Sequence, residues 1–252
     1  MSEPIFVAFA SQKGGCGKST LTTLVSSYLS YVQGIDVLVI DCDPRQHTQK
    51  SYRDSDVMVT RENPNYRKTM EKFYEMYGKP PYEIVCTTPA QAIEAAQEKL
   101  SAGNSAKIVF FDITGTINDL HIVNLIASMH YLFVPITPET GDMKSSLCFA
   151  NQVNEEMITT NATSIKEMKL LWNKVPGRVK PQICELIDNY MEELNLSSLE
   201  TVLSNSSKYF KDGVLTGQNG IFRSTILPPD KRLLKNSNLP ELVNEIRKVI
   251  NI

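Results

Sequence analysis

Short apolar runs recur along the chain and alternate with longer segments of mixed polarity. Each run has about the length of a buried strand and is bounded by polar residues, glycine or proline. The runs span residues 5–10, 36–42, 82–88, 107–113, 131–136 and 168–173. Continuous apolar runs are typical of strands covered on both faces, and the helix-length segments between them favour parallel pairing. The pattern predicts a doubly wound α/β fold, with a mostly parallel sheet flanked by helices.

Two stripes of apolar residues at helical spacing occur in the last third of the chain. The first consists of Ile183, Leu186, Ile187, Tyr190, Met191 and Leu194, and the second of Leu242, Val243, Ile246, Val249 and Ile250. Both are predicted to face the core. An amphipathic membrane anchor is the alternative for the second stripe, but the polar face of that helix lacks the basic excess of such anchors.

Residues 51–81 are charged and aromatic, with several apolar side chains at helical separations. This spacing predicts a helix packed over the edge of the sheet. A partner-binding surface is the alternative.

Composition narrows the classes of protein to which the chain can belong. With 252 residues and 42% apolar content, it is predicted to form one domain over residues 1–252. A net charge of -2 excludes a surface that is basic throughout, so any contact with DNA needs a local patch. No apolar run approaches the roughly 20 residues that span a bilayer, and the first residues lack the basic start of a signal peptide. Scattered cysteines, without a CxxC pair or a Cys/His cluster at metal spacing, predict reduced, mostly buried thiols in a cytoplasmic protein.

A glycine-rich segment directly follows the first predicted strand. Residues 11–20 read SQKGGCGKST and precede a helix-like stretch, so strand, loop and helix occur in the order of a phosphate-binding loop. Glycines let backbone N–H groups turn toward a phosphate, and the following helix directs its positive end at the anion. Lys18 is expected to reach the β and γ phosphates, and the Ser19 hydroxyl to bind Mg2+. The other predicted nucleotide contacts in this loop are Gly14, Gly15, Cys16, Gly17 and Thr20.

The same loop departs from the usual pattern at its start. Where a glycine is usual, the chain has Gln12, followed by a second lysine, Lys13. The string QKGGCGKST resembles the deviant Walker A motif KGGxGK[ST] of the ParA/MinD family, and its glutamine is more similar to the ParA branch. The resemblance implies a P-loop ATPase that uses ATP and Mg2+ and pairs as a homodimer in the ATP state. In that family the lysine matching Lys13 crosses the interface to the partner's phosphates, where it offsets charge repulsion during binding and catalysis.

Two other predicted strands end in carboxylates, where ligands collect in a doubly wound sheet. The segment DCDP at residues 41–44 resembles the family's DxDPQxN segment. The resemblance implies that Asp41 acts near Mg2+ and orients the attacking water, with Asp43 in support. Arg45 stands where the family usually has glutamine. Asp112 ends the fourth strand and is predicted to hold Mg2+ through water, as a Walker B carboxylate does.

The expected adenine and DNA contacts lie in the second half of the chain. Asn173 matches the position from which family members bind adenine, and an Asn amide can read the donor and acceptor pair of that base. Leu227 and Pro228 end a segment that resembles the family's closing strand, and they are expected to flank the base. The positions that match basic residues for sequence-independent DNA binding are Arg178, Lys180, Lys231 and Arg232. Ordinary solvated basic residues are the alternative.

The resemblance favours a switch that partitions or positions DNA on a plasmid, chromosome or mobile element. Such a switch works with a ParB-like activator and associates with the nucleoid when ATP is bound, without a membrane. A metabolic ligase or an iron-sulfur reductase on the same fold is one alternative, although a reductase needs paired interface cysteines that are missing at the matching positions. A nucleotide-bound interaction module that does not hydrolyse ATP is another, because Arg45 and residues 114–115 depart from the family pattern.

Overall fold

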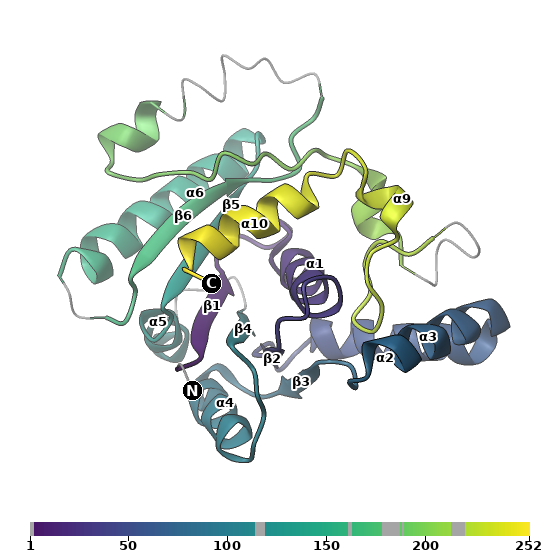
Figure 1. Ribbon diagram of the computed structural model, residues 1–252. Helices are drawn as coiled ribbons and strands as arrows, with labels where there is room; N and C mark the ends of the chain where they lie inside the picture. Colours follow the sequence, from purple (N-terminus) through teal and green to yellow (C-terminus); the bar gives the residue numbers. More distant parts are fainter. Residues whose placement is uncertain (1–2, 114–118, 161–162, 178–186, 188, 213–219) are drawn as a thin grey trace.

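The computed structural model describes residues 3–113, 119–160, 163–177, 187, 189–212 and 220–252 (Figure 1). Its centre is a parallel sheet with the strand order β3-β2-β4-β1-β5-β6. The strands are β1 (Ile5–Phe9), β2 (Val37–Asp41), β3 (Glu83–Cys86), β4 (Ile108–Asp112), β5 (Tyr131–Ile136) and β6 (Glu167–Trp172). Every predicted run overlaps one of these strands, so the predicted fold class is confirmed.

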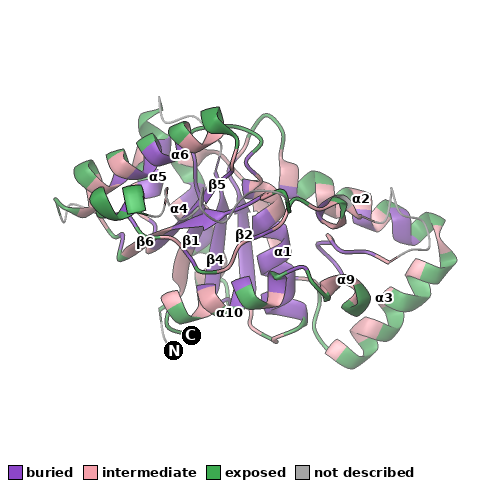
Figure 2. Ribbon diagram, turned by 90° about the horizontal axis from the view of Figure 1, so that it is seen from above, coloured by how far each residue is buried: buried purple, intermediate pink, exposed green. Residues whose placement is uncertain are grey.

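Helices cover both faces of the sheet (Figures 1 and 2). One face packs against α1 (Lys18–Tyr31) and α10 (Leu239–Val249), and the other against α4 (Ala92–Ser101), α5 (Leu120–Ala127) and α6 (Thr140–Val153). Along each strand, successive side chains enter opposite cores, as Ala8 and Phe9 do in β1. The chain order reverses between β4 and β5 on either side of β1, and such a switch point is where an open α/β sheet forms a ligand crevice.

The apolar stripe of α10 lies in the core, as predicted. Leu242, Val243 and Ile246 have no exposed surface, and Ile250 is 1% exposed. The apolar face that a membrane anchor would need is therefore already covered by the protein. Within the described ranges, no helix is both long and apolar enough to cross a bilayer.

The earlier apolar stripe is only partly described. Met191 is buried and Ile187 and Leu194 pack against the core, but Tyr190 is 50% exposed, so its predicted burial is wrong. Ile183 and Leu186 lie outside the described residues. The described cysteines differ in burial, because Cys16 and Cys42 are buried whereas Cys86 and Cys148 are exposed.

Residues 51–81 form parts of two helices rather than the single helix that we predicted. They are α2 (Thr48–Glu62) and α3 (Pro64–Tyr77). Pro64 cannot continue α2, and the side chain of Asn63 accepts a hydrogen bond from the backbone N–H of Asn65 at 3.0 Å, which caps the start of α3. No residue of α3 is fully buried, and α3 contacts the protein through one aromatic face.

The segment at residues 221–230 is not the strand that the sequence suggested. The carboxylate of Asp56 in α2 accepts hydrogen bonds from both the backbone N–H and the hydroxyl of Thr225, each at 2.6 Å. Arg53 donates to the carbonyl oxygen of Thr225 at 3.1 Å. Side chains of α2 therefore satisfy the backbone of this segment, and hydrogen bonds to a neighbouring strand do not. The short elements η1 (Pro89–Gln91), η2 (Asn154–Ile158), η3 (Ser207–Phe210) and α9 (Lys231–Leu234) complete the described helices.

Candidate nucleotide-binding site

The glycine-rich loop joins β1 to α1 at the carboxyl edge of the sheet. Gly15 and Gly17 have φ values of 82° and 100°, in the left-handed region that favours glycine. A Cβ atom on Gly17 would lie 2.6 Å from Nδ2 of Asn173, so the loop also packs too closely there for any side chain. Around Gly14 and Gly15 no atom lies within 4 Å of such a position. The loop is thus closed toward Asn173 and open beside its first two glycines.

Lys18 lies in the first turn of α1 and folds back into the loop. The residue is only 8% exposed. Its Nζ donates to the backbone carbonyl of Lys13 at 2.9 Å and to the hydroxyl of Ser11 at 3.5 Å. The ammonium group therefore lies inside the curve of the loop, next to the positive end of α1, which is the placement that an anionic phosphate requires.

Ser19 and Asp112 form a pair suited to a hydrated divalent cation. The Ser19 hydroxyl donates to one carboxylate oxygen of Asp112 at 3.0 Å, and the amide of Gln49 donates to the other at 2.8 Å. Burial raises the pKa of Asp112 from 3.8 to about 6, although these two hydrogen bonds act in the opposite direction. A buried carboxylate that forms no ion pair with the described residues fits Mg2+ beside the phosphates.

Asp41 lies next to Asp112 in the register of β2 and β4, but its Oδ2 is directed at the start of α2. Its side chain has no exposed surface. Oδ2 accepts the backbone N–H groups of Gln49 at 2.9 Å and Lys50 at 3.1 Å. Burial raises the pKa of Asp41, and the backbone hydrogen bonds oppose that effect. The carboxylate thus anchors the start of α2, which carries the Gln49 side chain that contacts Asp112.

Asp43 lies on the loop that follows β2 and is less buried. Its Oδ1 accepts the backbone N–H groups of Arg45 at 3.0 Å and Gln46 at 3.2 Å. Within these hydrogen bonds Oδ2 takes no part, so Asp43 keeps one carboxylate oxygen for another partner.

Lys13 points out of the loop toward the start of α6. Its ammonium group forms an ion pair with Asp142 and lies 3.6 Å from Glu139. The hydrogen bond with Asp142 raises the pKa of Lys13 and lowers the pKa of Asp142. The side chain of Lys13 remains 46% exposed. The two lysines of the loop therefore face opposite ways, Lys18 inward and Lys13 outward.

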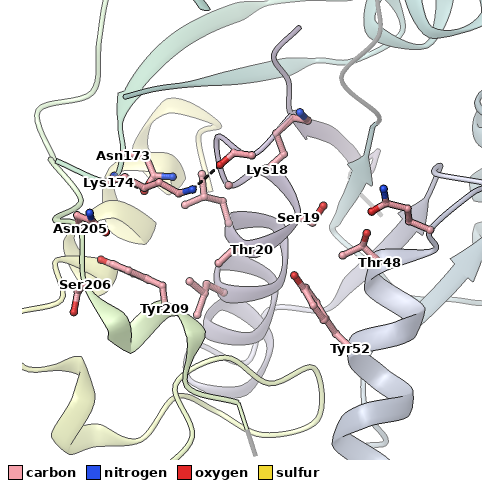
Figure 3. A pocket seen from close by; sticks show the side chains of 15 residues that line it. Lys18, Ser19, Thr20, Thr48, Tyr52, Asn173, Lys174, Asn205, Ser206 and Tyr209 are labelled. Carbon is pink, nitrogen blue, oxygen red and sulfur yellow. Dashed lines mark hydrogen bonds between the residues drawn. The ribbon is translucent and has the colours of Figure 1, made fainter. Parts of the chain in front are cut away.

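A cavity of about 360 Å³ opens beside the loop and the start of α1 (Figure 3). Asn173 lines it, and its Nδ2 donates to the carbonyl of Cys16 at 2.8 Å. Lys174 donates to the carbonyl of Gly15 at 2.5 Å. Lining residues that the sequence analysis did not single out include Tyr52, Lys174, Asn205, Ser206 and Tyr209. No motif marks them, because they come from segments that are far apart in the sequence, including α2 and η3.

Leu227 and Pro228 do not lie at this cavity. They line a second cavity, of about 620 Å³, together with residues of α3. Their predicted contact with adenine therefore has no support from the described geometry.

The basic candidates for DNA contact are only partly described. Arg178 and Lys180 lie outside the described residues, as do residues 114–118 of the loop after β4. Lys231 and Arg232 are exposed at the start of α9, where Arg232 forms an ion pair with Asp230 at 2.7 Å.

The sheet order, the glycine loop and the strand-end carboxylate define an α/β P-loop nucleotide-binding protein. The chain belongs to the CobQ/CobB/MinD/ParA nucleotide binding domain family, whose model matches residues 7–212. It is thus a protein of the ParA/MinD type, as its loop sequence predicts. A sequence comparison with curated proteins finds no match.

Solved structures of other proteins share this fold. A plasmid partition protein from Borrelia burgdorferi B31 bound to AMPPNP has a TM-score of 0.63 at 15% identity, over 98% of this chain and 99% of that chain. McdA from Cyanothece in complex with ATP has a TM-score of 0.62 at 13% identity, over 100% of this chain and 98% of that chain. Cobyrinic acid a,c-diamide synthase from Mycobacterium smegmatis with bound ADP and magnesium has a TM-score of 0.53 at 18% identity, over 82% and 89%.

Proposed function

We propose that this chain is a Mg-ATP-dependent dimerisation switch of the ParA type, which partitions or positions DNA and resets by hydrolysing ATP. One observation carries the proposal. A single loop turns Lys18 into the nucleotide site and Lys13 out of it, so the protein has one lysine for its own nucleotide and one for a neighbour.

The residues of the loop divide the work of holding ATP. Residues 14–20 surround the triphosphate, with backbone N–H groups and the positive end of α1 directed at its oxygens. The hydroxyl of Ser19 and the carboxylate of Asp112 would hold Mg2+. The bound Mg2+ neutralises charge on the phosphates. Asn173 donates a hydrogen bond to the carbonyl of Cys16, which stabilises the loop, and it lines the cavity where the nucleoside would lie.

Asp43 is the carboxylate best placed to orient the attacking water. The role expected for Asp41 changes, because this carboxylate is fully buried and its Oδ2 accepts two backbone hydrogen bonds from the start of α2, whereas Asp43 is only partly buried. Asp41 instead keeps Gln49 against Asp112 and Ser19, and so acts on the Mg2+ site through α2. Asp43 keeps one oxygen for a water molecule and lies on the loop that joins β2 to α2.

Lys13 supplies the switch. In a pair of protomers it would exchange the carboxylates of Asp142 and Glu139 for the phosphates of the partner's ATP. A triphosphate carries more negative charge than the two carboxylates, and the seam between protomers excludes water that would screen it. ADP lacks the γ phosphate that favours this exchange, so hydrolysis reopens the pair.

DNA binding belongs to the paired state. Lys231 of each protomer is exposed and, within the described residues, carries no ion pair, whereas Arg232 is paired with Asp230. Pairing doubles the number of such cations in one particle, and each phosphate contact makes binding more sensitive to salt. A ParB-like partner is expected to stimulate hydrolysis on the nucleoid.

Phosphate release provides the test. We would compare the wild-type protein with Lys18→Ala, and with Lys166→Ala as a matched control on the exposed surface remote from the loop. Saturating Mg-ATP should give slow release that Lys18→Ala abolishes, that Lys166→Ala retains, and that double-stranded DNA changes. Release equal to that of Lys18→Ala would leave a binding module that does not hydrolyse ATP. Stimulation by a small carboxylic acid, and not by DNA, would favour a ligase.

A further inference from the structure

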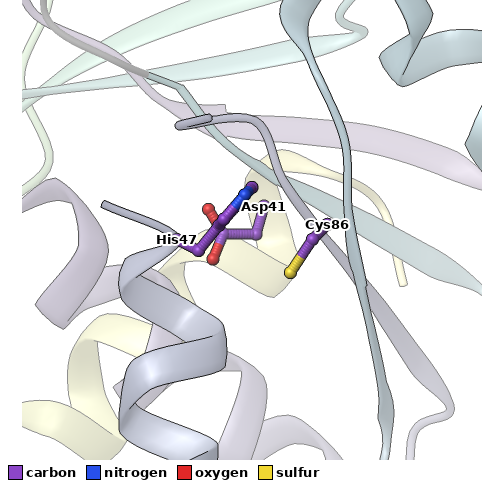
Figure 4. A group of neighbouring side chains, drawn as sticks. All are labelled: Asp41, His47 and Cys86. Atoms are coloured by element: carbon purple, nitrogen blue, oxygen red, sulfur yellow. The ribbon is translucent and has the colours of Figure 1, made fainter. Parts of the chain in front are cut away.

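Three side chains with metal-binding atoms meet at the carboxyl ends of β2 and β3. Asp41 and Cys86 are partners in the parallel register of these strands, so both side chains leave the same face of the sheet. His47 precedes α2 and lies against them. The carboxylate, the imidazole and the thiol each offer one ligand atom, and these atoms all lie within 4.8 Å of one another (Figure 4).

The imidazole of His47 has a polar atom that the protein leaves unsatisfied. Its Nδ1 is buried and has no hydrogen-bond partner within the described residues. The backbone of His47 has a φ of 42°, in the left-handed region where non-glycine residues are uncommon, and its N–H donates to the carbonyl of Asp43 at 2.9 Å. The fold therefore places this ring beside Asp41 without giving its buried nitrogen a partner, which a metal ion would supply.

The carboxylate of Asp41, next to the ring of His47, is held in one orientation. Its Oδ2 is taken by the backbone N–H groups of Gln49 and Lys50, while Oδ1 has only a long contact of 3.4 Å with the N–H of Asp43. The carboxylate is thus held in orientation and keeps lone pairs on Oδ1. Cys86 is exposed, so an ion can enter from solvent on that side.

We propose that Asp41, His47 and Cys86 form a binding site for a thiophilic divalent metal ion of the Zn2+ class. Sulfur, nitrogen and oxygen ligands together suit Zn2+, whereas Mg2+ takes oxygen ligands almost alone. Its ligands therefore differ from the Ser19–Asp112 pair, which is suited to Mg2+. Binding replaces the proton of the Cys86 thiol, which passes to solvent, by a metal–sulfur bond, and three protein ligands leave one position for water.

The proposed metal site is linked to the nucleotide site by α2. Asp41 holds the start of that helix, and Gln49 in its first turn contacts both Asp112 and the carbonyl of Ser19. Occupancy by Zn2+ is therefore expected to change the affinity for Mg-ATP. This consequence rests on the proposed function, but metal binding itself does not.

Cobalt titration without nucleotide tests the site and stays separate from any failure of ATP binding. Metal-free protein in a non-chelating reductant would be titrated with Co2+, followed by displacement with Zn2+. We expect one ion per chain, with visible bands of a four-coordinate ion and a near-ultraviolet thiolate-to-cobalt band that Zn2+ removes. Cys86→Ser should abolish the thiolate band, and His47→Ala should weaken binding about tenfold or more. Cys148→Ser, which removes another exposed thiol, should behave like the wild type.

Alkylation gives a second readout for the same ligands. With Zn2+ present, Cys86 should react more slowly with iodoacetamide than in the metal-free protein, while Cys148 should react at an unchanged rate, as measured by peptide mass spectrometry. The proposal is overturned if Co2+ gives no thiolate band, if the band survives in Cys86→Ser, or if Zn2+ protects both cysteines equally. Near-ultraviolet circular dichroism of each variant would show that loss of the band does not come from unfolding.

Discussion

Asp112 is buried and forms no ion pair with the described residues, so replacing it with asparagine should change stability and nucleotide binding in opposite directions. The carboxylate is 3% exposed, and burial raises its pKa from 3.8 to about 6. Each pH unit of such a difference corresponds to about 1.4 kcal/mol, so the ionised carboxylate destabilises the metal-free fold by about 3 kcal/mol. An asparagine side chain at this position cannot ionise but keeps an oxygen that can accept a hydrogen bond.

The sign of the pH dependence follows from which state ionises first. As the pH rises above 3.8, the unfolded chain loses this proton while the folded chain keeps it until about pH 6. Between these values the folded state binds more protons, so the wild-type protein loses stability as the pH rises, and the loss is complete above pH 6. Asp112→Asn should match the wild type near pH 4 and exceed its free energy of unfolding by up to about 3 kcal/mol at pH 7.5.

Urea denaturation in EDTA, at a series of pH values, measures this difference. In a second titration without EDTA, Mg-ATP should stabilise the wild type strongly and Asp112→Asn weakly, because the variant lacks the charge that holds the cation. The reasoning fails if Asp112→Asn is no more stable relative to the wild type at pH 7.5 than at pH 4.5. It also fails if Mg-ATP stabilises both proteins equally.

Further substitutions separate the roles within the site. Gly17→Ala should lower the free energy of unfolding by about 1–3 kcal/mol, because φ is 100° and the new Cβ meets a neighbouring amide at 2.6 Å; urea denaturation measures this, and an unchanged midpoint would count against the packing described. Asp43→Asn should keep the free energy of unfolding but slow phosphate release about 100-fold. Asp41→Ala should lower the free energy of unfolding by about 1–2 kcal/mol, because it removes the hydrogen-bond acceptor at the start of α2. If Asp41→Ala instead slows release and Asp43→Asn lowers stability, Asp41 is the catalytic carboxylate. Asp142→Asn removes the main ion pair of Lys13, so sedimentation should detect ATP-dependent dimers at severalfold lower protein concentration. An unchanged concentration would show that this ion pair does not oppose dimerisation.

Local patterns explain why much of this protein can be predicted from sequence. Each strand of the buried sheet has a continuous apolar run, and the strand order places Asp41 and Asp112 side by side. The phosphate loop is equally local, because its glycines, Lys18 and Ser19 lie within a few residues of one another. For the same reason Lys13 was identified, although its contact with Asp142 on another helix was not.

Features set by distant contacts escaped prediction. The segment at 221–227 is apolar enough for a strand, but Asp56 and Arg53 of α2 satisfy the backbone of Thr225 instead. Pro64 is a local signal for the break between α2 and α3. The helical spacing of the apolar and aromatic residues in this segment nevertheless predicted one continuous helix. Asp41 and Cys86 are 45 positions apart in the numbering and meet only through the register of β2 and β3, so spacing alone gave no sign of a metal cluster.

The oligomeric state in different nucleotides tests the proposed switch most directly. Sedimentation of the wild-type protein with Mg2+ and a non-hydrolysable ATP analogue should give a dimer, and with ADP a monomer. Lys13→Ala should bind the analogue with near wild-type affinity and remain a monomer. Dimerisation of Lys13→Ala to the wild-type extent, or a wild-type protein that stays monomeric with its site saturated, would contradict the account.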